Sequence, residues 1–500
     1  MICACIAEPD TKSALARMAE TRRWAELFEI RLDGMARPDL ARLFAPGPRP
    51  TIATCRRVGE GGAWRGSERR RLALLRAAAK VGADFVDIER DAARSLGPIF
   101  GARRIVSYHD FAGMPADLPG LARSLWALEA DVIKIAAVPR GFADALALLE
   151  LPERCRRPAV VLGMGAAGLP TRALLPLFSG AWTCAAAAVG RETAPGQPTA
   201  RELVERYRYR RLDEHTALFG VVGDPVGHSV GPGLFNRLFA RLGTNAIYLP
   251  FLCRDRADLA ALLRLPAVQG LSVTIPHKEL ALRVVDAASP AATAIGAANT
   301  LVRTGGKAPP RGHRTARRDR WYAENTDEPA VADSIVRLAA LAGLPSPSGL
   351  DALVLGAGGA ARAAVHALRR LGCRIAVSGR TGARARALAR GLGVAFAPWS
   401  SLADRRPDLL VNATPVGMSP RTDAIPLPPA MIRPGMLVLD LVYTPPETRW
   451  VREARKRGAF ALGGFDMFVD QAALQAELFT GVKPDRRRLE RWVREALRAR

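Results

Sequence analysis

Short apolar runs alternate with Ala- and Leu-rich stretches through the first part of the chain. The runs have the length of β-strands and cover residues 2–7, 28–33, 51–56, 84–89, 104–110, 131–137, 159–165 and 182–188. Between them, segments such as 68–81, 118–130 and 143–149 carry apolar residues at the spacing of helices that pack on a sheet. Eight βα units in succession predict a (β/α)8 barrel. The spacing alone leaves an open, doubly wound sheet as the alternative.

Polar side chains interrupt these apolar runs near their C-terminal ends. In the second run, Glu29 and Arg31 point to the same face, because alternate residues of a strand do so. The later interruptions are Arg56, Glu89, His109 and Lys134. A (β/α)8 barrel gathers the C-terminal ends of its strands at one face, so the pattern predicts a site there.

Lys134 stands in the apolar segment DVIKIAAVP, although only seven of the 73 basic residues are lysines. Burial of an ammonium group is costly and lowers its pKa, which would leave free amine able to form a Schiff base with a ketone. His109 could serve as the general acid–base of such a reaction, and Glu89 could orient its ring. The alternatives are a lysine that reaches out to solvent and a structural histidine.

Seven motifs in register resemble the type I 3-dehydroquinate dehydratase family across about residues 1–205: FEIRLD, TCRRVGEGGAWRG, FVDIE, SYHDF, DVIKIA, GMGAAGLPTR and TAPGQ. The resemblance implies that Lys134 forms the Schiff base with dehydroquinate. It also implies that His109, supported by Glu89, removes the adjacent proton and helps to expel the hydroxyl as water. The substrate contacts that it implies are Glu29, Arg31, Arg56, Arg172, Thr193 and Gln197. Thr193 stands where the family usually has serine.

A second αβ pattern begins near residue 217, after the charged segment 199–215, which is expected to be helical. In it, an apolar strand leads into Gly356-x-Gly358-x-x-Ala361 and a helix, the arrangement that holds a dinucleotide pyrophosphate at a helix N-terminus. The next strand lacks the acidic residue that binds a ribose diol. The residues that follow it are Ser378, Arg380, Thr381 and Arg384. This favours NADP(H) over NAD, although the arginines could equally be ordinary surface charge.

Lys278 follows a predicted strand in LSVTIPHK, and Asp327 ends the motif ENTD. Together they could form the acid–base couple that protonates the alkoxide made by hydride delivery. The alternative for Asp327 is a helix cap.

With VVGDPVGHSVGP, GAANTL, NATPVGM, DLVYTPPET and GFDMFVDQAALQ, these motifs resemble the shikimate dehydrogenase family over about residues 217–500. The resemblance implies that Lys278 and Asp327 are catalytic. The substrate contacts that it implies are Ser229, Thr274, Asn299, Tyr443 and Gln471. Residues 412–418 would border the nicotinamide, and the implied cofactor contacts are Gly356, Ala357, Gly358, Gly359, Ala360, Ala361, Ser378, Arg380, Thr381, Arg384, Thr414, Val416, Met418 and Gly464.

Three positions depart from the dehydrogenase pattern. Gly231 replaces a serine, and Glu324 and Glu328 replace glycines on either side of Asn325 and Asp327. The missing hydroxyl and the added carboxylates bear on substrate recognition, so the choice between shikimate and quinate stays open.

Composition and charge limit the other classes of protein to which this chain could belong. The formal charge of +25 rests mostly on arginine, and the basic segment 303–320 is expected to be a surface insertion. A nucleic-acid binder is an alternative, but no recognition motif accompanies the charge.

The seven cysteines form no metal-spaced pair, which predicts a reducing compartment and no metal site. No apolar run approaches the ~18 residues of a membrane helix, and no signal peptide precedes the first strand, so a cytoplasmic protein is expected.

The expected architecture is α/β, with an N-terminal (β/α)8 barrel followed by a two-lobed dehydrogenase that contains a Rossmann-type NADP domain. The expected domains are residues 1–205, residues 216–330 completed by helices in 467–500, and residues 331–466. The resemblances imply two consecutive steps on small molecules, from 3-dehydroquinate to 3-dehydroshikimate and on to shikimate with NADPH. A homodimer is compatible with this, and no nucleic-acid or membrane partner is expected. Quinate oxidation with NAD and a catalytically inactive regulatory homologue are the alternatives.

Overall fold

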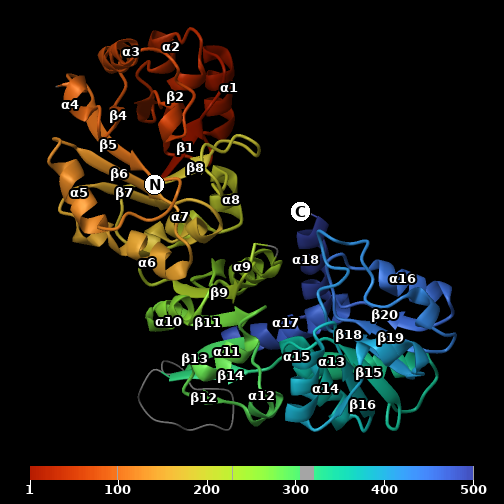
Figure 1. The fold of residues 1–500 in the computed structure, drawn as a ribbon. Coiled ribbons are helices and arrows are strands. Elements are labelled where there is room, and N and C mark those ends of the chain that lie inside the picture. Colours follow the sequence, from red (N-terminus) through yellow and green to blue (C-terminus); the bar gives the residue numbers. More distant parts are fainter. Residues whose placement is uncertain (98, 228, 305–319, 499–500) are drawn as a thin grey trace. The chain divides into compact units, whose positions relative to one another are not determined.

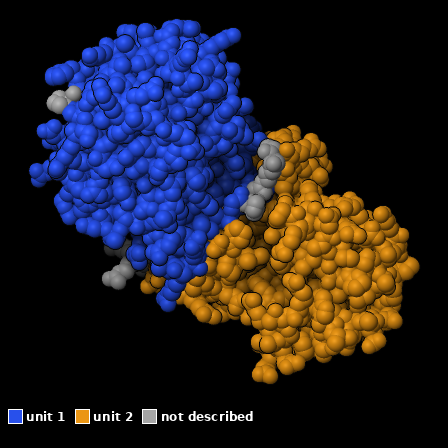
Figure 2. All heavy atoms as spheres, turned by 45° about the horizontal axis from the view of Figure 1, so that its top comes forward, with its two compact units in different colours: residues 1–220, 226–268 blue, residues 221–225, 269–500 orange. Residues whose placement is uncertain are grey.

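The computed structural model describes residues 1–97, 99–227, 229–304 and 320–498. The chain divides into two compact units, residues 1–220 with 226–268 and residues 221–225 with 269–500 (Figure 2). The interior of the expected basic insertion, residues 305–319, lies outside the described residues. None of the described helices has both the length and the apolar character needed to cross a membrane.

Eight parallel strands of the first unit form a near-closed barrel with the order β7-β6-β5-β4-β3-β2-β1-β8 (Figure 1). The strands are β1 (Ile2–Ile6), β2 (Leu27–Arg31), β3 (Thr51–Thr54), β4 (Phe85–Glu89), β5 (Arg103–His109), β6 (Val132–Ala137), β7 (Ala159–Gly163) and β8 (Thr183–Ala186). The helices of this half are α1 (Thr11–Thr21), α2 (Leu40–Leu43), α3 (Glu68–Lys80), α4 (Ala93–Leu96), α5 (Leu118–Trp126), α6 (Phe142–Glu150), α7 (Leu169–Ala173) and α8 (Ala200–Glu205). Neighbouring strands follow chain order, which confirms the barrel and excludes a doubly wound sheet here.

Alternation along the strands sorts the barrel interior into layers. One apolar cluster includes Leu27, Ile52, Phe85, Ile105 and Val132. Two positions further along the same strands come the buried residues Glu29, Thr54, Asp87, Ser107 and Lys134. Because side chains two residues apart point to the same side of a strand, a polar layer lies directly on the apolar one. Hydrophobic packing therefore closes the barrel below, and the charged groups lie toward the C-terminal ends of the strands.

The segment between the two αβ patterns is not one continuous helix, since α8 is followed by a separate 3-10 turn at Tyr209–Arg211. Thr199 and Glu202 form a capping box at the N-terminus of α8, which fixes where this helix begins. The helix ends at Glu205, and Arg208 beyond it adopts a positive φ of 56°. A residue in that conformation cannot continue a right-handed helix, so the expected helix over 199–215 is limited to residues 200–205.

A mixed six-stranded sheet comes next, with the order β10-β9-β11-β13-β14-β12. Its strands are β9 (Ala217–Gly223), β10 (Ala246–Leu252), β11 (Val268–Val273), β12 (Ala287–Ala288), β13 (Thr300–Thr304) and β14 (Arg320–Glu324). Its helices are α9 (Gly231–Leu242), α10 (Arg256–Arg264), α11 (Lys278–Arg283) and α12 (Pro290–Ile295). Lys278 therefore begins a helix just beyond the C-terminal end of β11.

The last sheet has six parallel strands in the order β17-β16-β15-β18-β19-β20. They are β15 (Asp351–Leu355), β16 (Arg374–Ser378), β17 (Ala395–Phe396), β18 (Leu409–Asn412), β19 (Leu437–Asp440) and β20 (Phe460–Leu462). The remaining helices are α13 (Asp327–Leu341), α14 (Gly359–Arg370), α15 (Gly382–Leu392), α16 (Arg449–Lys456), α17 (Phe465–Thr480) and α18 (Arg486–Arg498). Counted from β15, this is the strand order of dinucleotide-binding sheets, which confirms the Rossmann-type fold.

Candidate active sites

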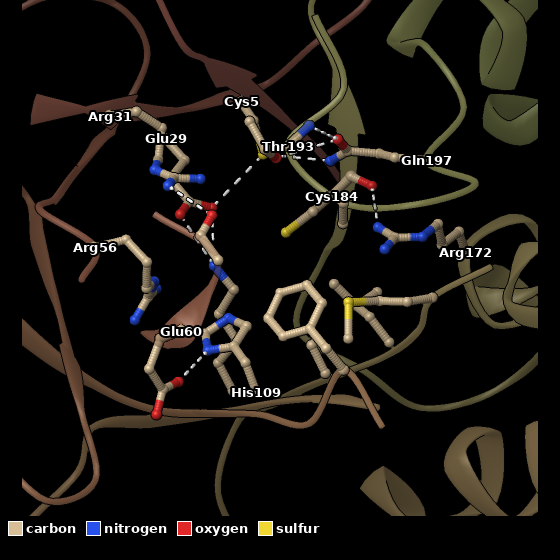
Figure 3. A pocket seen from close by; sticks show the side chains of 17 residues that line it. Cys5, Glu29, Arg31, Arg56, Glu60, His109, Arg172, Cys184, Thr193 and Gln197 are labelled. Atoms are coloured by element: carbon tan, nitrogen blue, oxygen red, sulfur yellow. Dashed lines mark hydrogen bonds and ion pairs between the residues drawn. The ribbon is translucent and has the colours of Figure 1, made fainter. Parts of the chain in front are cut away.

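A hollow opens at the C-terminal ends of the barrel strands (Figure 3). The residues expected from the sequence that line it are Glu29, Arg31, Arg56, His109, Lys134, Arg172, Thr193 and Gln197. Eight side chains from distant parts of the chain thus meet in one place. Glu89 is the one expected residue of this half that does not line the hollow.

Lys134 is buried between two carboxylates. Its Nζ lies 2.9 Å from Oε2 of Glu29 and 3.1 Å from Oδ2 of Asp87. Burial disfavours the ammonium form, but the two carboxylates outweigh it and raise the pKa of Lys134. The expectation that burial would lower this pKa was therefore wrong, because the barrel brings β2 and β4 carboxylates into the same layer as β6. Lys134 is therefore charged before a ketone binds, and the carboxylates of Glu29 and Asp87 are the acceptors for its protons.

The ring of His109 contacts a different acid from the one expected. Its Nδ1 lies 3.0 Å from Oε2 of Glu60, in the loop after β3 (Figure 3). Burial, together with the charges of Arg56 and Lys134, holds the pKa of His109 well below its usual range. A neutral imidazole next to Lys134 is able to accept a proton, which is what a general base requires.

Glu89 contacts two arginines rather than the ring of His109. Its carboxylate accepts from Arg71 at 2.5 Å and lies 3.4 Å from Nη1 of Arg56. Both arginines are buried, so Glu89 neutralises charge behind the site and holds Arg56 in place. The carboxylate that contacts His109 in this structure is that of Glu60.

Two acids of the site were missed from the sequence. Asp87 precedes Glu89 by two residues in FVDIE, and strand alternation alone would have placed both on the inner face. Glu60 lies in the polar loop VGEGG, where nothing in the local pattern shows that it folds back over the barrel.

Arg172 is a buried cation without an acidic partner in the described part of the chain. Its guanidinium donates to the carbonyl oxygens of Gly163 and Cys184, at 3.2 and 2.7 Å. Burial lowers its pKa, since no carboxylate offsets the desolvation. A guanidinium fork of this kind matches a carboxylate ligand. Arg31 differs, because it already forms a bidentate pair with Asp33.

Thr193 and Gln197 fix the loop that closes one side of the hollow. The backbone N–H and the hydroxyl of Thr193 donate to Oε1 of Gln197 at 2.8 and 3.1 Å. The amide of Gln197 donates in turn to the thiol of Cys5 at 3.5 Å. The hydroxyl that distinguishes Thr193 from alanine is thus used in shaping this loop.

The second unit brings Lys278 and Asp327 together. Nζ of Lys278 lies 2.5 Å from Oδ2 of Asp327, and the amide of Asn299 donates to Oδ1 of Asp327 at 2.9 Å. The same amide lies 3.4 Å from Oε1 of Gln471. Thr326 occupies the cap position of α13, while Asp327 lies in its first turn with its carboxylate turned toward Lys278. A simple capping role for Asp327 is therefore excluded.

The two glutamates that replace family glycines bond away from this couple. Glu324 accepts from the hydroxyl of Ser289 at 2.6 Å. Glu328 pairs with Arg370 of α14 at 3.0 Å. Both carboxylates therefore have partners other than Lys278.

The remaining expected substrate contacts are placed as follows. Thr274 follows β11, and its N–H donates to the carbonyl of Val222 at 2.9 Å. Tyr443 stacks on Phe468, with ring centroids 4.2 Å apart. Ser229 belongs to the first compact unit, where its hydroxyl accepts from the N–H of Gly231 at 3.1 Å.

The glycine-rich turn has the shape that a dinucleotide needs. Gly356 has a φ of +128°, and a Cβ there would lie 2.8 Å from the carbonyl oxygen of Ala413. Gly358 caps α14 with open space beside it, so the free N–H groups of the helix can receive phosphate. Arg380 and Arg384 are exposed and form no ion pair within the described residues. The buried hydroxyl of Ser378 is likewise unpartnered there. These residues fit NADP(H).

Comparisons with known proteins give matches for both parts of the chain. Residues 2–214 match the type I 3-dehydroquinase family, residues 221–301 the shikimate dehydrogenase substrate binding domain, and residues 464–491 the shikimate 5'-dehydrogenase C-terminal domain. The chain is 33% identical over 481 residues to the chloroplastic bifunctional 3-dehydroquinate dehydratase/shikimate dehydrogenase of Arabidopsis thaliana, covering 92% of this chain and 78% of that one. It is 28% identical to the shikimate biosynthesis protein AroDE of Chlamydia pneumoniae, covering 96% and 95%.

A solved structure resembles the second part alone. It is a shikimate dehydrogenase in complex with NADP+, with a TM-score of 0.50 and 28% identity, covering 57% of this chain and 97% of that one. The two halves therefore match two enzymes of consecutive steps, a lyase and an NADP-dependent oxidoreductase. The chain belongs to the family of bifunctional 3-dehydroquinate dehydratase/shikimate dehydrogenases of the shikimate pathway.

Proposed function

We propose that Lys134 and His109 carry the dehydratase reaction of this enzyme. The observation that supports this most directly is the position of a neutral His109 beside a charged, carboxylate-held Lys134 in one hollow. Lys134 transfers protons to Glu29 or Asp87, attacks the ketone of 3-dehydroquinate and forms an imine with loss of water. His109 removes the proton next to the imine carbon and returns it to the leaving hydroxyl, which departs as a second water. Hydrolysis of the imine uses one water and restores the amine.

The remaining polar groups of the hollow position the substrate. Arg172 binds the substrate carboxylate, because it is the buried guanidinium without an acidic partner among the described residues. Glu29, Arg31, Arg56, Thr193 and Gln197 contact the hydroxyls. Glu60 holds the ring of His109, and Glu89 acts only behind the site.

Borohydride reduction in the presence of dehydroquinate tests this mechanism. The expected product is a single adduct on the peptide that contains Lys134, and none in Lys134→Ala. Lys80 offers an internal control, since it is an exposed lysine on α3 and should remain unmodified. An active enzyme that yields no adduct at Lys134 would contradict the proposal.

We propose that Lys278 and Asp327 carry the second reaction. NADPH supplies the hydride, and Lys278 gives a proton to the oxygen that becomes the new hydroxyl. Asp327 orients Lys278, which takes its proton back from solvent, while Asn299 holds Asp327 in place. The other substrate contacts of this proposal are Ser229, Thr274, Tyr443 and Gln471. The cofactor lies along Gly356, Ala357, Gly358, Gly359, Ala360 and Ala361, with Ser378, Arg380, Thr381 and Arg384 at the 2′-phosphate and Thr414, Val416, Met418 and Gly464 at the nicotinamide.

The matching test is Lys278→Ala. Turnover of shikimate should fall by about a hundredfold or more, while the Kd of NADP+ and the dehydratase activity of the same chain stay near wild type. Near-normal shikimate turnover in this variant would remove Lys278 from the reaction.

The domain boundaries, the cellular compartment and the oligomeric state are also proposals. The family matches and the sheets support domains over 1–205, over 216–330 with 467–500, and over 331–466. Seven cysteines without disulfides are consistent with a reducing compartment, and we propose the cytoplasm. Light scattering of the purified chain tests the proposed homodimer, and a monomer mass would exclude it.

A further inference from the structure

Asp440, at the end of β19, is a buried carboxylate whose hydrogen-bond partners among the described residues are neutral groups. One of its oxygens accepts from the amide of Asn412 at 2.8 Å and from the N–H of Val442 at 3.1 Å. The other accepts from the hydroxyl of Thr448 at 2.6 Å. The side chain has no solvent exposure, and no cation pairs with it among the described residues. A buried charge without a counter-ion is costly, and such a group is rare without a function.

Burial raises the pKa of Asp440 to about 6, and the three hydrogen bonds oppose a larger rise. The groups that influence its ionisation are the side chains of Thr448 and Asn412 and the N–H of Val442, none of which is charged. Asp440 is therefore an anion at pH values above about 6.

The hydrogen bonds of Asp440 lead directly into the segment 412–418. Asn412 pairs with Asp440 in register across β18 and β19. Its amide also donates to the carbonyl of Val416 at 3.2 Å, and its own oxygen accepts from the hydroxyl of Thr414 at 2.6 Å. The C-terminal ends of parallel strands are where such sheets bind their ligands. The charge thus lies at the base of the segment that borders the nicotinamide in the proposed function.

We propose that the buried charge of Asp440 makes this site favour the oxidised nicotinamide, which is a cation, over the reduced and neutral ring. The inference rests on the proposed placement of residues 412–418 beside the nicotinamide. A fixed anion attracts a cation strongly across a medium of low dielectric constant, and within the described part of the chain no cation pairs with Asp440 to weaken its field. The pyrophosphate and the 2′-phosphate are common to NADP+ and NADPH, so their contacts cancel when the two affinities are compared.

The test is Asp440→Asn, a change that removes the charge and nearly preserves the shape. The Kd values of NADP+ and NADPH are measured separately, by calorimetry and by nucleotide fluorescence, at about pH 8. The Kd of NADP+ should rise about tenfold more than that of NADPH. Equal losses for both forms would show a purely structural role and overturn the inference.

Two further variants separate charge from hydrogen bonding. Thr448→Val removes a donor but keeps the anion, so it should change both Kd values by the same factor. The exchange Asn412→Asp with Asp440→Asn restores one carboxylate and one amide with their positions reversed, and should restore the preference for NADP+. An exchange variant that folds but keeps the Asp440→Asn ratio would contradict the proposal.

Wild-type enzyme provides a measurement that does not depend on any variant folding. The preference for NADP+ should decline as the pH falls through about 6, because Asp440 takes up a proton there. An unchanged preference between about pH 8 and pH 5 would overturn the inference. Failure of the wild-type chain to bind either form would instead overturn the proposed cofactor site, so the two failures are distinguishable.

Discussion

The backbone of Gly359 lies directly against the side chain of Lys278. A Cβ atom on Gly359 would lie 2.8 Å from Cβ of Lys278 and 2.9 Å from its Cδ. The same glycine begins α14, the helix proposed to receive the pyrophosphate. One position therefore couples the cofactor turn to the proposed proton donor.

Gly359→Ala should displace the side chain of Lys278 from its present position beside Asp327. Because the stem of Lys278 must shift to make room, we expect kcat for shikimate to fall by about tenfold, with a smaller change in the Kd of NADP+. Gly391→Ala in α15 is the control, since nothing lies within 4 Å of a Cβ at that position and Gly391 is not among the proposed cofactor contacts. Equal effects of the two substitutions on kcat would contradict the contact as the cause.

Glu60 and Glu89 should differ in what their loss does to the dehydratase. Glu60→Gln removes the acid that holds His109, so kcat should fall by roughly ten- to hundredfold while the melting temperature stays near wild type. Glu89→Gln removes the buried carboxylate that Arg71 and Arg56 share, while Arg71 keeps its ion pair with Glu68, so it should cost about 1–3 kcal/mol of folding free energy. Thermal unfolding and steady-state kinetics on both variants distinguish the roles. The reverse pattern would reinstate Glu89 as the partner of His109.

The dehydratase rate should depend on the ionisation of Glu60. Burial raises the pKa of Glu60 to about 7. Above that pH its carboxylate accepts the Nδ1–H of His109 and leaves Nε2 free to take a proton; below it, the protonated acid donates to Nδ1 and Nε2 carries the hydrogen. The rate should therefore rise as the pH increases through about 7. In Glu60→Gln this limb of the pH profile should disappear, and its persistence would assign the limb to another group.

Removal of one carboxylate should make Lys134 more acidic. Glu29→Gln or Asp87→Asn takes away one of the two charges that raise the pKa of Lys134, so borohydride trapping should reach its maximum at a lower pH than in wild type. The double variant leaves a buried ammonium without a partner and should be strongly destabilised. An unshifted trapping profile in both single variants would show that these carboxylates do not control the lysine.

Restoring the family serine at position 231 should carry a steric cost. A Cβ on Gly231 would lie 2.9 Å from the ring of Tyr248 and 3.1 Å from Oγ of Ser229. Gly231→Ala and Gly231→Ser share this clash, and each should lose about 1–3 kcal/mol of folding free energy. The difference between them isolates the hydroxyl, which should lower KM for shikimate relative to quinate. Identical KM ratios in the two variants would exclude residue 231 from substrate choice.

The local sequence pattern was sufficient to predict most strands and helices, and those site residues that lie at the end of a strand or the start of a helix. Lys134, His109 and Arg56 stand out because strand alternation in a barrel places inner residues at the C-terminal ends of parallel strands. Lys278 and the glycine turn stand out because each follows a strand and opens a helix. These inferences depend on the positions of residues that are close in the chain, and the periodicity of apolar residues reveals those positions.

Pairings across long sequence separations were decided by tertiary structure alone. Sequence order favoured Glu89 as the partner of His109, yet Glu60 occupies that position because its loop folds back over the barrel, and Glu89 is neutralised by Arg71. The charge state of Lys134 likewise depends on Glu29, 105 positions away. Electrostatic energy depends on distance in space and on burial, and the linear pattern contains neither quantity. The sequence by itself therefore determined which ionisable groups are present. The tertiary structure determined which of these groups are charged and which partner each of them has.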